Sequence, residues 1–310
     1  MNFVIPETYL GDGRISLSNL LEKYRELEKS GWQMDVVAIQ EGLPIIALTT
    51  PLKDNNPVKS LWILGGIHGE EPAGPNAFFT RIEVINNLAK EGVPTVFIPL
   101  LNPLGYSKDW RYENEKRDFR LGHSVTDAEH LLLNSKGNPR IDSPNSQTAK
   151  QILNWVTKTM LQYQPELVFD HHEDVVDEIY PPGDSRNLTS CYVYLSGNDN
   201  NGIDIAKSID QIFKDTSLPV VDNGTTRFGE KIQDGIVPNT QDGSIDEFFV
   251  SEKYFDINTQ KIVTKRPTPV VLVVETTVPF DNPIPLAKRQ TAHEKIINAY
   301  SDFWKKIILD

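Results

Sequence analysis

Two apolar stretches of the sequence end in side chains that could bind a metal ion. The first, residues 61–64, runs into GGIHGEEPAG, which places His68 and Glu71 three positions apart. That spacing lets an imidazole and a carboxylate converge on one point from a turn or from the first turn of a helix. The same pattern also fits a surface loop whose acids favour the start of the next helix, so it needs partners from elsewhere in the chain.

The second stretch, LVFDHHEDV at residues 167–175, offers two candidate partners, His171 and His172. Because successive side chains of a strand point to opposite faces, at most one of the two can lie beside His68. Two imidazoles and one carboxylate form a zinc site of the catalytic type, whose fourth position stays open for water. The residues alone leave the choice between His171 and His172 open.

A third stretch, TPVVLVVETTVPF, places Glu275 at the end of another apolar run. A carboxylate at the end of a buried strand is costly unless it has a partner or a function. Partial burial raises the pKa of a carboxyl toward the range that suits a general base. The plain alternative is a glutamate that is solvated at the edge of the strand.

Alternating strand-like and helix-like segments must position these side chains, and they predict an α/β fold with a central mixed, mostly parallel β-sheet flanked by helices. The strand-like segments are residues 34–40, 44–50, 60–66, 95–102, 167–173, 191–197 and 269–277. The helix-like segments are residues 16–31, 75–92, 146–163, 201–216 and 285–309. We expect one catalytic domain over residues 1–310, with residues 1–34 as an N-terminal extension packed on it. Residues 105–147 and 223–268 read as irregular, and loops of that length are commonly functional.

Composition narrows the class of protein. The 310 residues carry a formal net charge of −12, which disfavours nucleic acid and anionic membranes as partners. No apolar run approaches the ~18 residues of a membrane span, and the first residues lack the pattern of a signal peptide. The single cysteine, Cys191, lies in an apolar segment and cannot form an internal disulfide. We therefore expect a cytoplasmic protein in which Cys191 is buried.

In their order along the chain, the three stretches resemble the zinc carboxypeptidases of the carboxypeptidase A type. The resemblance implies that His68, Glu71 and His172 bind one zinc ion and that Glu275 is the general base. A fourth stretch, NPLG at residues 102–105 followed by Trp110-Arg111, is similar to the family's Asn-Pro-x-Gly segment and its following arginine. The resemblance thus implies that Arg111 polarises the scissile carbonyl.

The sequence departs from the family where substrate is bound. Carboxypeptidases of this type usually carry an Asn-Arg pair for the terminal carboxylate of the substrate, and residues 111–130 contain no such pair. Arg117 or Arg120 could replace it, because a guanidinium binds a carboxylate through two hydrogen bonds. Tyr254 resembles in placement the family's substrate-binding tyrosine. His293 reads as a surface residue of the last helix.

The resemblance implies a zinc-dependent metallocarboxypeptidase that hydrolyses an amide bond near the C-terminus of a peptide or peptide-like substrate. One alternative is an N-acyl-amino-acid deacylase similar to aspartoacylase and succinylglutamate desuccinylase. Those enzymes generally carry a further domain after their catalytic glutamate, for which residues 276–310 leave no room. Another alternative is a non-catalytic peptide-binding relative, which would have no use for Glu275. The expected partner is a small peptide or an N-acyl amino acid, and the oligomeric state stays open.

Overall fold

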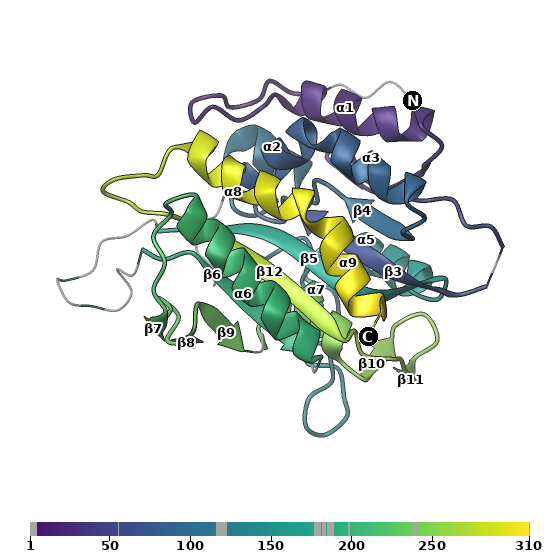
Figure 1. Ribbon diagram of the computed structural model, residues 1–310. Coiled ribbons are helices and arrows are strands. Elements are labelled where there is room, and N and C mark those ends of the chain that lie inside the picture. The colour runs from purple at the N-terminus through teal and green to yellow at the C-terminus, as the bar shows by residue number, and fades with distance from the viewer. Residues whose placement is uncertain are drawn as a thin grey trace.

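The computed structural model describes residues 5–54, 56–115, 123–176, 181, 184, 189–197, 199–238 and 241–309. Within these residues the chain forms an α/β fold in which helices cover both faces of one large sheet (Figure 1). The predicted fold class is confirmed. No helix of the described part is both long enough and apolar enough to cross a bilayer.

The large sheet has ten strands in the order β1-β2-β4-β3-β5-β12-β6-β9-β8-β7. Their bounds are β1 Gln33–Gln40, β2 Leu43–Thr49, β3 Val58–Gly65, β4 Thr95–Ile98, β5 Tyr163–Val175, β6 Tyr192–Gly197, β7 Asn223–Thr225, β8 Lys231–Gln233, β9 Ile236–Pro238 and β12 Val270–Val278. Two further strands, β10 Lys253–Asp256 and β11 Lys261–Thr264, form a separate antiparallel hairpin.

The centre of the sheet is parallel and its edges are largely antiparallel. Strands β4, β3, β5 and β12 run in parallel as neighbours, so their carboxyl ends meet at one edge of the sheet. The neighbours β1, β2 and β4 pair antiparallel, as do β12 and β6. The expectation of a mostly parallel sheet therefore holds for the four central strands, which are the strands that carry the candidate site.

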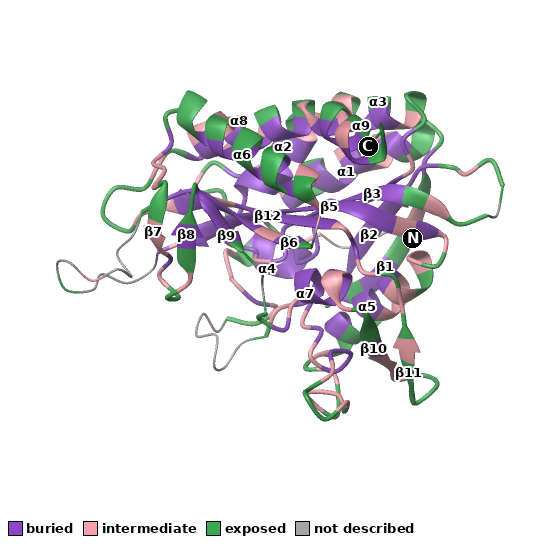
Figure 2. Ribbon diagram, turned by 60° about the horizontal axis from the view of Figure 1, so that its bottom comes forward, coloured by how far each residue is buried: buried purple, intermediate pink, exposed green. Residues whose placement is uncertain are grey.

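The helices lie in two layers. Their bounds are α1 Leu17–Lys29, α2 Ala73–Thr80, α3 Ile82–Lys90, α4 Pro103–Lys108, α5 Gln147–Thr159, α6 Asn200–Asp215, α7 Ile245–Val250, α8 Leu286–Asn298 and α9 Tyr300–Leu309. Helices α1, α2, α3, α6, α8 and α9 cover one face, and α5 and α7 lie on the other with the β10-β11 hairpin (Figure 2). Several helices begin after a serine whose hydroxyl accepts from a backbone N–H of the first turn, such as Ser16 before α1 and Ser146 before α5.

Both faces of the central strands are buried, which explains why these strands read as continuous apolar runs. Along β3, Leu61 and Ile63 belong to the core under the larger helical layer. Trp62 and Leu64 alternate with them and belong to the core on the side of α5 and α7. The same alternation along β5 and β12 decides which of their polar residues face each layer.

The helical segments differ from the expected ones at two places. The segment 75–92 divides at Arg81 into α2 and α3, and the C-terminal segment divides at Ala299 into α8 and α9. The two regions that read as irregular contain the short elements α4 and α7 and the strands β7 to β11. Periodicity does not detect such short elements, because each spans only one or two helical turns or a few strand residues.

Candidate metal centre and active site

The loop between β3 and α2 presents His68 and Glu71. Strand β3 ends at Gly65, and Gly66 turns the chain with a φ of 63°, which favours glycine. The loop is held close to the segment that follows β4, because a Cβ on Gly69 would lie 2.0 Å from the carbonyl carbon of Gly105. The folded loop brings His68 Nδ1 to 2.7 Å from Glu71 Oε1.

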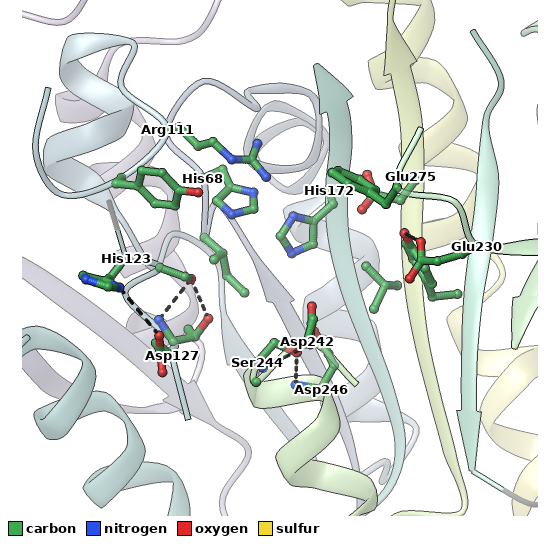
Figure 3. Close-up of a pocket in the computed structure, with 18 residues that line it drawn as sticks. His68, Arg111, His123, Asp127, His172, Glu230, Asp242, Ser244, Asp246 and Glu275 are labelled. Atoms are coloured by element: carbon green, nitrogen blue, oxygen red, sulfur yellow. Dashed lines mark hydrogen bonds and ion pairs between the residues drawn. The ribbon is translucent and has the colours of Figure 1, made fainter. Parts of the chain in front are cut away.

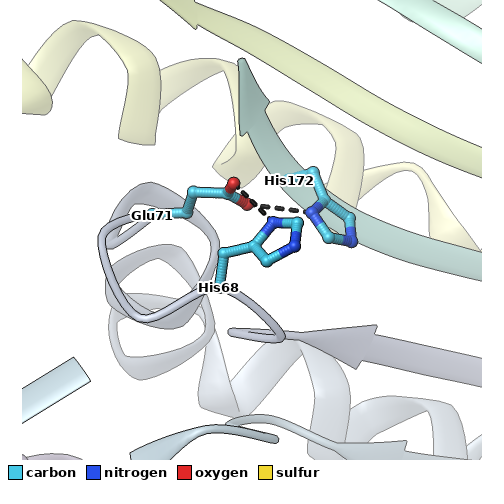
Figure 4. Close-up of side chains that lie close together, drawn as sticks. All are labelled: His68, Glu71 and His172. Carbon is cyan, nitrogen blue, oxygen red and sulfur yellow. Dashed lines mark hydrogen bonds and ion pairs between the residues drawn. The ribbon is translucent and has the colours of Figure 1, made fainter. Parts of the chain in front are cut away.

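Strand β5 adds His172 to this pair (Figure 4). His172 Nδ1 lies 2.8 Å from the second carboxylate oxygen of Glu71, Oε2. One ligand atom from each of His68, Glu71 and His172 lies within 4.8 Å of the others. Two imidazole nitrogens and a carboxylate oxygen at this separation fit a divalent metal site.

His171 points to the opposite face of the sheet, as strand alternation requires. Its ring contacts Phe78 of α2 at a centroid distance of 5.0 Å, under the larger helical layer. Of the two histidines that the sequence left open, the structure therefore brings His172 to His68 and Glu71.

Glu71 and His172 are buried and His68 is partly exposed, and the charge of each side chain shifts the pKa of the others. Burial and the nearby guanidinium of Arg111 lower the pKa of His68 to about 4, which keeps its ring neutral at neutral pH. Burial alone would raise the pKa of Glu71, but the imidazoles of His68 and His172 outweigh it and hold the carboxyl below its usual range. Against the effect of burial, Asp170 and Glu71 raise the pKa of His172 well above its usual range, so a cation that binds here must displace a proton from that ring.

Groups around the cluster orient its ligand atoms. Asp170, two residues before His172 on the same face of β5, places Oδ2 3.2 Å from His172 Nε2. This contact fixes the ring so that Nδ1 faces Glu71. The backbone N–H of Glu173 donates to Glu71 Oε2 at 3.1 Å. The sequence reasoning missed Asp170, although its spacing of two from His172 on a strand already indicated a shared face.

Glu275 lies beside this cluster on β12. The register of the parallel strands pairs Glu275 with His172, so the two side chains emerge next to each other on one face. Glu275 Oε2 is buried and has no hydrogen-bond partner. Burial raises the pKa of the Glu275 carboxyl well above its usual range, with the carboxylates of Glu71 and Asp174 adding to the shift. A carboxyl whose pKa is raised from its usual acidic range suits general acid–base chemistry.

Arg111 reaches the same cluster from the loop after α4. Its Nη1 lies 3.2 Å from Glu70 Oε1 and 3.1 Å from Glu71 Oε1. The backbone of Arg111 is fixed independently, because its carbonyl accepts from the N–H of Gly69 at 3.2 Å and from Asn102 Nδ2 at 3.3 Å. The Asn102-Pro103 stretch therefore ties the arginine to the loop that carries His68.

One cavity of about 460 Å³ opens onto these groups (Figure 3). Its lining includes His68, His172, Arg111 and Glu275. The far wall comes from residues 123–127 and from the start of α7, and aromatic side chains of Tyr112, Tyr194 and Phe228 border it. The cavity lies at the carboxyl ends of the central strands, where open α/β sheets bind their ligands.

Comparison with solved structures identifies the fold of this chain. The sequence matches no protein-family model and has no significant match among curated proteins. A Shewanella amazonensis protein described as a candidate metallopeptidase superposes with a TM-score of 0.66 at 20% identity, over 99% of both chains. A metallo-carboxypeptidase from Burkholderia cenocepacia superposes with a TM-score of 0.56 at 13% identity, over 94% of this chain and 70% of its own. One from Pseudomonas aeruginosa gives a TM-score of 0.51 at 14% identity, over 92% of this chain and 69% of its own.

This chain has the metallo-carboxypeptidase fold. The resemblance that the sequence motifs indicate is confirmed at the level of the fold, over far more of the chain than the four short stretches. Within this carboxypeptidase fold, the His68, Glu71 and His172 cluster lies on β5 and on the loop after β3, at the edge where the central parallel strands end.

Of the three tentative substrate-binding residues, Arg117 and Arg120 lie outside the described residues. Tyr254 lies on β10, where its ring packs edge-on against Phe248 at 5.4 Å and borders small hollows near Leu161 and Asn258. The structure does not bring Tyr254 to the cavity, because the β10-β11 hairpin holds it beside α5 and α7.

The expectation for His293 is wrong, because this residue is fully buried. His293 Nδ1 lies 2.7 Å from His171 Nδ1, and His293 Nε2 lies 3.1 Å from the hydroxyl of Thr276. The remaining nitrogen of His171 contacts the hydroxyl of Tyr300. On α8 the buried positions 286, 289, 293 and 297 form one stripe. The helical periodicity therefore indicated that position 293 is buried, although positions 289 and 293 carry polar residues.

Proposed function

We propose that this protein is a zinc-dependent metallocarboxypeptidase that hydrolyses an amide bond near the C-terminus of a peptide or peptide-like substrate. The observation that carries the proposal is that one cavity is lined by the two histidines of the His68, Glu71 and His172 cluster, by Glu275, whose Oε2 is buried and unpartnered, and by Arg111. Each of these groups has a distinct part in metal-assisted hydrolysis.

The residues present fit one zinc ion. Two imidazole nitrogens and one carboxylate are the ligand set of catalytic zinc sites, and His68, Glu71 and His172 supply it with ligand atoms within 4.8 Å of one another. The unsatisfied Glu275 Oε2 next to them supplies the acceptor that such a site needs for a water molecule. A zinc ion held there would polarise the substrate carbonyl and lower the pKa of water toward 7.

Glu275 is proposed as the general base and then the general acid. Its position next to His172 in the cavity lining supports a role in accepting a proton from a water that attacks the scissile carbonyl. The same carboxyl then returns the proton to the departing amine. The raised pKa makes the Glu275 carboxylate a stronger proton acceptor than an ordinary glutamate, which favours a general base.

Arg111 is proposed to stabilise the oxyanion that forms on the carbonyl. Its guanidinium lines the cavity beside His68 and Glu71, and its backbone is fixed by Gly69 and Asn102. A donor held in place before the reaction stabilises developing negative charge without reorganisation. The metallo-carboxypeptidase fold supports a peptidase more than a deacylase, because the matching structures include metallo-carboxypeptidases.

The test is zinc content together with a panel of peptides and N-acyl amino acids, run on the wild-type protein and on Glu275→Gln. We expect one zinc ion per chain, release of C-terminal residues by the wild type, and a rate about 10² to 10⁴ lower in Glu275→Gln with zinc retained. Glu252→Gln, an exposed site on another part of the surface, is the matched control.

Three outcomes would contradict the proposal. Release of acetate or succinate from N-acyl amino acids, without peptide cleavage, would identify a deacylase. Zinc binding without any cleavage would identify a peptide-binding protein. Equal rates for the wild type and Glu275→Gln would remove Glu275 from the mechanism.

A further inference from the structure

The chain just before α1 reaches both segments that carry the candidate site. Arg14 lies there with only 3% of its surface exposed, and it does not belong to the lining of the cavity. The backbone N–H of Tyr9 donates to the carbonyl of Ser107 at 2.8 Å. The hydroxyl of Tyr106 donates to the carbonyl of Ile15 at 2.9 Å. These contacts on either side of Arg14 fix the segment on α4.

Asp12 supplies Arg14 with a counter-ion. Its carboxylate accepts from Arg14 Nε at 3.0 Å and from Nη2 at 2.6 Å, so the two side chains form a two-contact ion pair. Burial alone would lower the pKa of the guanidinium, but the carboxylates of Asp12 and Asp109 outweigh it and raise this pKa. An arginine that served only as one half of an ion pair would need no acceptor beyond such a carboxylate.

The other donors of Arg14 point at the two segments of the site. Nη1 donates to the backbone carbonyl of Gly69 at 2.9 Å and to that of Tyr106 at 2.5 Å. Nη2 also donates to Asp109 Oδ1 at 2.5 Å. Gly69 lies between the two candidate ligands in the loop after β3, whereas Tyr106 and Asp109 belong to α4 and its C-cap. One planar group therefore joins two segments that are distant from it in the sequence.

The backbone of Gly69 is held from two sides. Its N–H donates to the carbonyl of Arg111 at 3.2 Å, and its carbonyl accepts from Arg14. Gly69 and Tyr106 are both buried. A buried carbonyl that loses its donor costs free energy comparable to a lost hydrogen bond. Removing the Arg14 guanidinium therefore favours movement of the loop after β3 away from α4.

Asp109 sets the direction in which the chain leaves α4. It is the C-cap residue of this helix, and its φ of 58° and ψ of 42° lie in the left-handed region. A residue with a side chain adopts this conformation at a cost, and the contact with Arg14 stabilises it. Trp110 and Arg111 follow directly. The guanidinium of Arg14 thus also fixes the start of the segment that carries Arg111.

We propose that Arg14 is a positioning residue for the candidate active site, because it fixes the loop that carries His68 and Glu71 relative to the segment that carries Arg111. The proposal rests on the proposed function for the roles of those three residues, whereas the tie between the two segments requires neither metal nor turnover. Metal ligands and an oxyanion donor act together only when their spacing is fixed before the substrate binds. Arg14 supplies that spacing from outside the cavity.

The first arm of the test measures the tie in the metal-free protein by hydrogen–deuterium exchange. Arg14→Lys keeps the positive charge but replaces the planar fork of donors by one ammonium group, which cannot reach all the acceptors together. We expect the amides of residues 66–72 and 105–112 to exchange about 10-fold faster or more, while those of β5 and β12 stay unchanged. Asp109→Asn is a milder second variant, because asparagine tolerates the left-handed conformation, and it should speed exchange in residues 105–112.

The second arm measures zinc affinity by competition with a chelator of known affinity. Each variant is titrated at a temperature where its metal-free form is fully folded by circular dichroism. Arg14→Lys should raise the zinc dissociation constant about 10- to 100-fold, which is the scale for removing a group that orients metal ligands. A merely structural role would lower the melting temperature of the metal-free protein and leave the dissociation constant unchanged.

Arg266→Lys is the matched control. Arg266 donates to the buried carboxylate of Glu166 through two contacts, at 2.5 Å and 3.0 Å. Glu166 lies near the start of β5, toward the opposite end of this strand from His172. The control variant loses the same fork of donors and should leave exchange in residues 66–72 and 105–112, and the zinc dissociation constant, unchanged.

The outcomes separate this proposal from the proposed function. Faster exchange in both segments of Arg14→Lys, together with weaker zinc binding, would support the role of Arg14. Unchanged exchange in either segment would overturn it, as would faster exchange with an unchanged zinc dissociation constant. A wild-type protein that binds zinc but cleaves no peptide would overturn the peptidase, while the two arms would still decide the role of Arg14. A wild-type protein that binds no zinc would overturn both.

Discussion

Glu275 and His172 are register partners on the adjacent parallel strands β12 and β5. Neighbouring residues in a parallel pair point to the same face of the sheet, so the backbone pairing alone places the two side chains together. The proposed base is therefore fixed to a proposed metal ligand through the rigid centre of the sheet. The loops supply the remaining groups, His68, Glu71 and Arg111.

Removing the metal should abolish activity and lower thermal stability. Dialysis against 1,10-phenanthroline should lower the melting temperature, and one equivalent of zinc should restore both properties, because an ion that binds only the folded state stabilises it by about 2.7 kcal/mol at 100 times its dissociation constant. His68→Ala should show no zinc-dependent stabilisation. His123→Ala, a half-exposed histidine outside the cluster, should still bind zinc, as measured by elemental analysis. A His68→Ala protein with a full zinc complement would contradict the ligand assignment.

Replacing Arg111 by methionine should lower kcat by about 10² to 10³ with a much smaller effect on KM. The reason is that the proposed oxyanion exists only in the transition state, so the guanidinium contributes little to ground-state binding. Steady-state kinetics on a cleaved peptide measure the two constants, and Arg81→Met, on the partly exposed start of α3, is the control. A rise in KM at constant kcat would instead assign Arg111 to binding the substrate carboxylate.

Replacing His293 by glutamine should flatten the dependence of stability on pH. Burial and the nearby Arg289 lower the pKa of His293 to about 3 in the folded protein, against about 6.5 in an unfolded chain. The unfolded state therefore binds a proton that the folded state excludes, so this contribution to stability is complete above pH 6.5 and declines as pH falls toward 3. The slope reaches about 1.4 kcal/mol per pH unit.

Urea unfolding at several pH values between 7 and 4, in the presence of a chelator, measures this slope. The His293→Gln protein should lose stability less steeply than the wild type over this range. It should also be less stable at pH 8 by about 1 to 3 kcal/mol, because His171 and Thr276 lose a hydrogen-bond partner. Identical slopes would show that His293 does not titrate in this way.

Replacing Gly69 by alanine should destabilise the fold and weaken zinc binding together. The added Cβ would lie 2.0 Å from the carbonyl carbon of Gly105, so the loop carrying His68 must move away from the backbone of α4. We expect a loss of about 1 to 3 kcal/mol in the free energy of unfolding. Gly224→Ala is the control, because its Cβ would meet only a side-chain atom of Val221, at 3.1 Å. Unchanged zinc affinity in Gly69→Ala would show that the close approach does not position the cluster.

Several parts of the site were predictable because they depend on local pattern. The apolar runs before His68, His172 and Glu275 predict three strands, and β3, β5 and β12 confirm them, although β5 and β12 continue past His172 and Glu275. Strand alternation predicts that only one of His171 and His172 joins the cluster. The mixed sheet follows from the alternation of strand-like and helix-like segments.

Other parts were not predictable from local pattern. His293 reads as a surface residue because its helix carries many charges, yet His171 on β5 provides a polar partner inside the core. Asp246 lies in a segment that reads as irregular, and only the placement of α7 against β12 brings it to the cavity. Tyr254 follows the expected spacing from Glu275, but the hairpin β10-β11 directs it elsewhere.

The sequence by itself determined the elements, the residue types at their ends and the face of each strand side chain, because period and apolar content act over a few neighbouring residues. The tertiary structure decided which ends meet. Strand order and register join residues about a hundred positions apart, and the packing of helices on each face determines whether a polar side chain has a partner. For that reason the pairing of His172 with Glu275, the burial of His293 and the unpartnered Oδ1 of Asp246 became visible only in the folded chain.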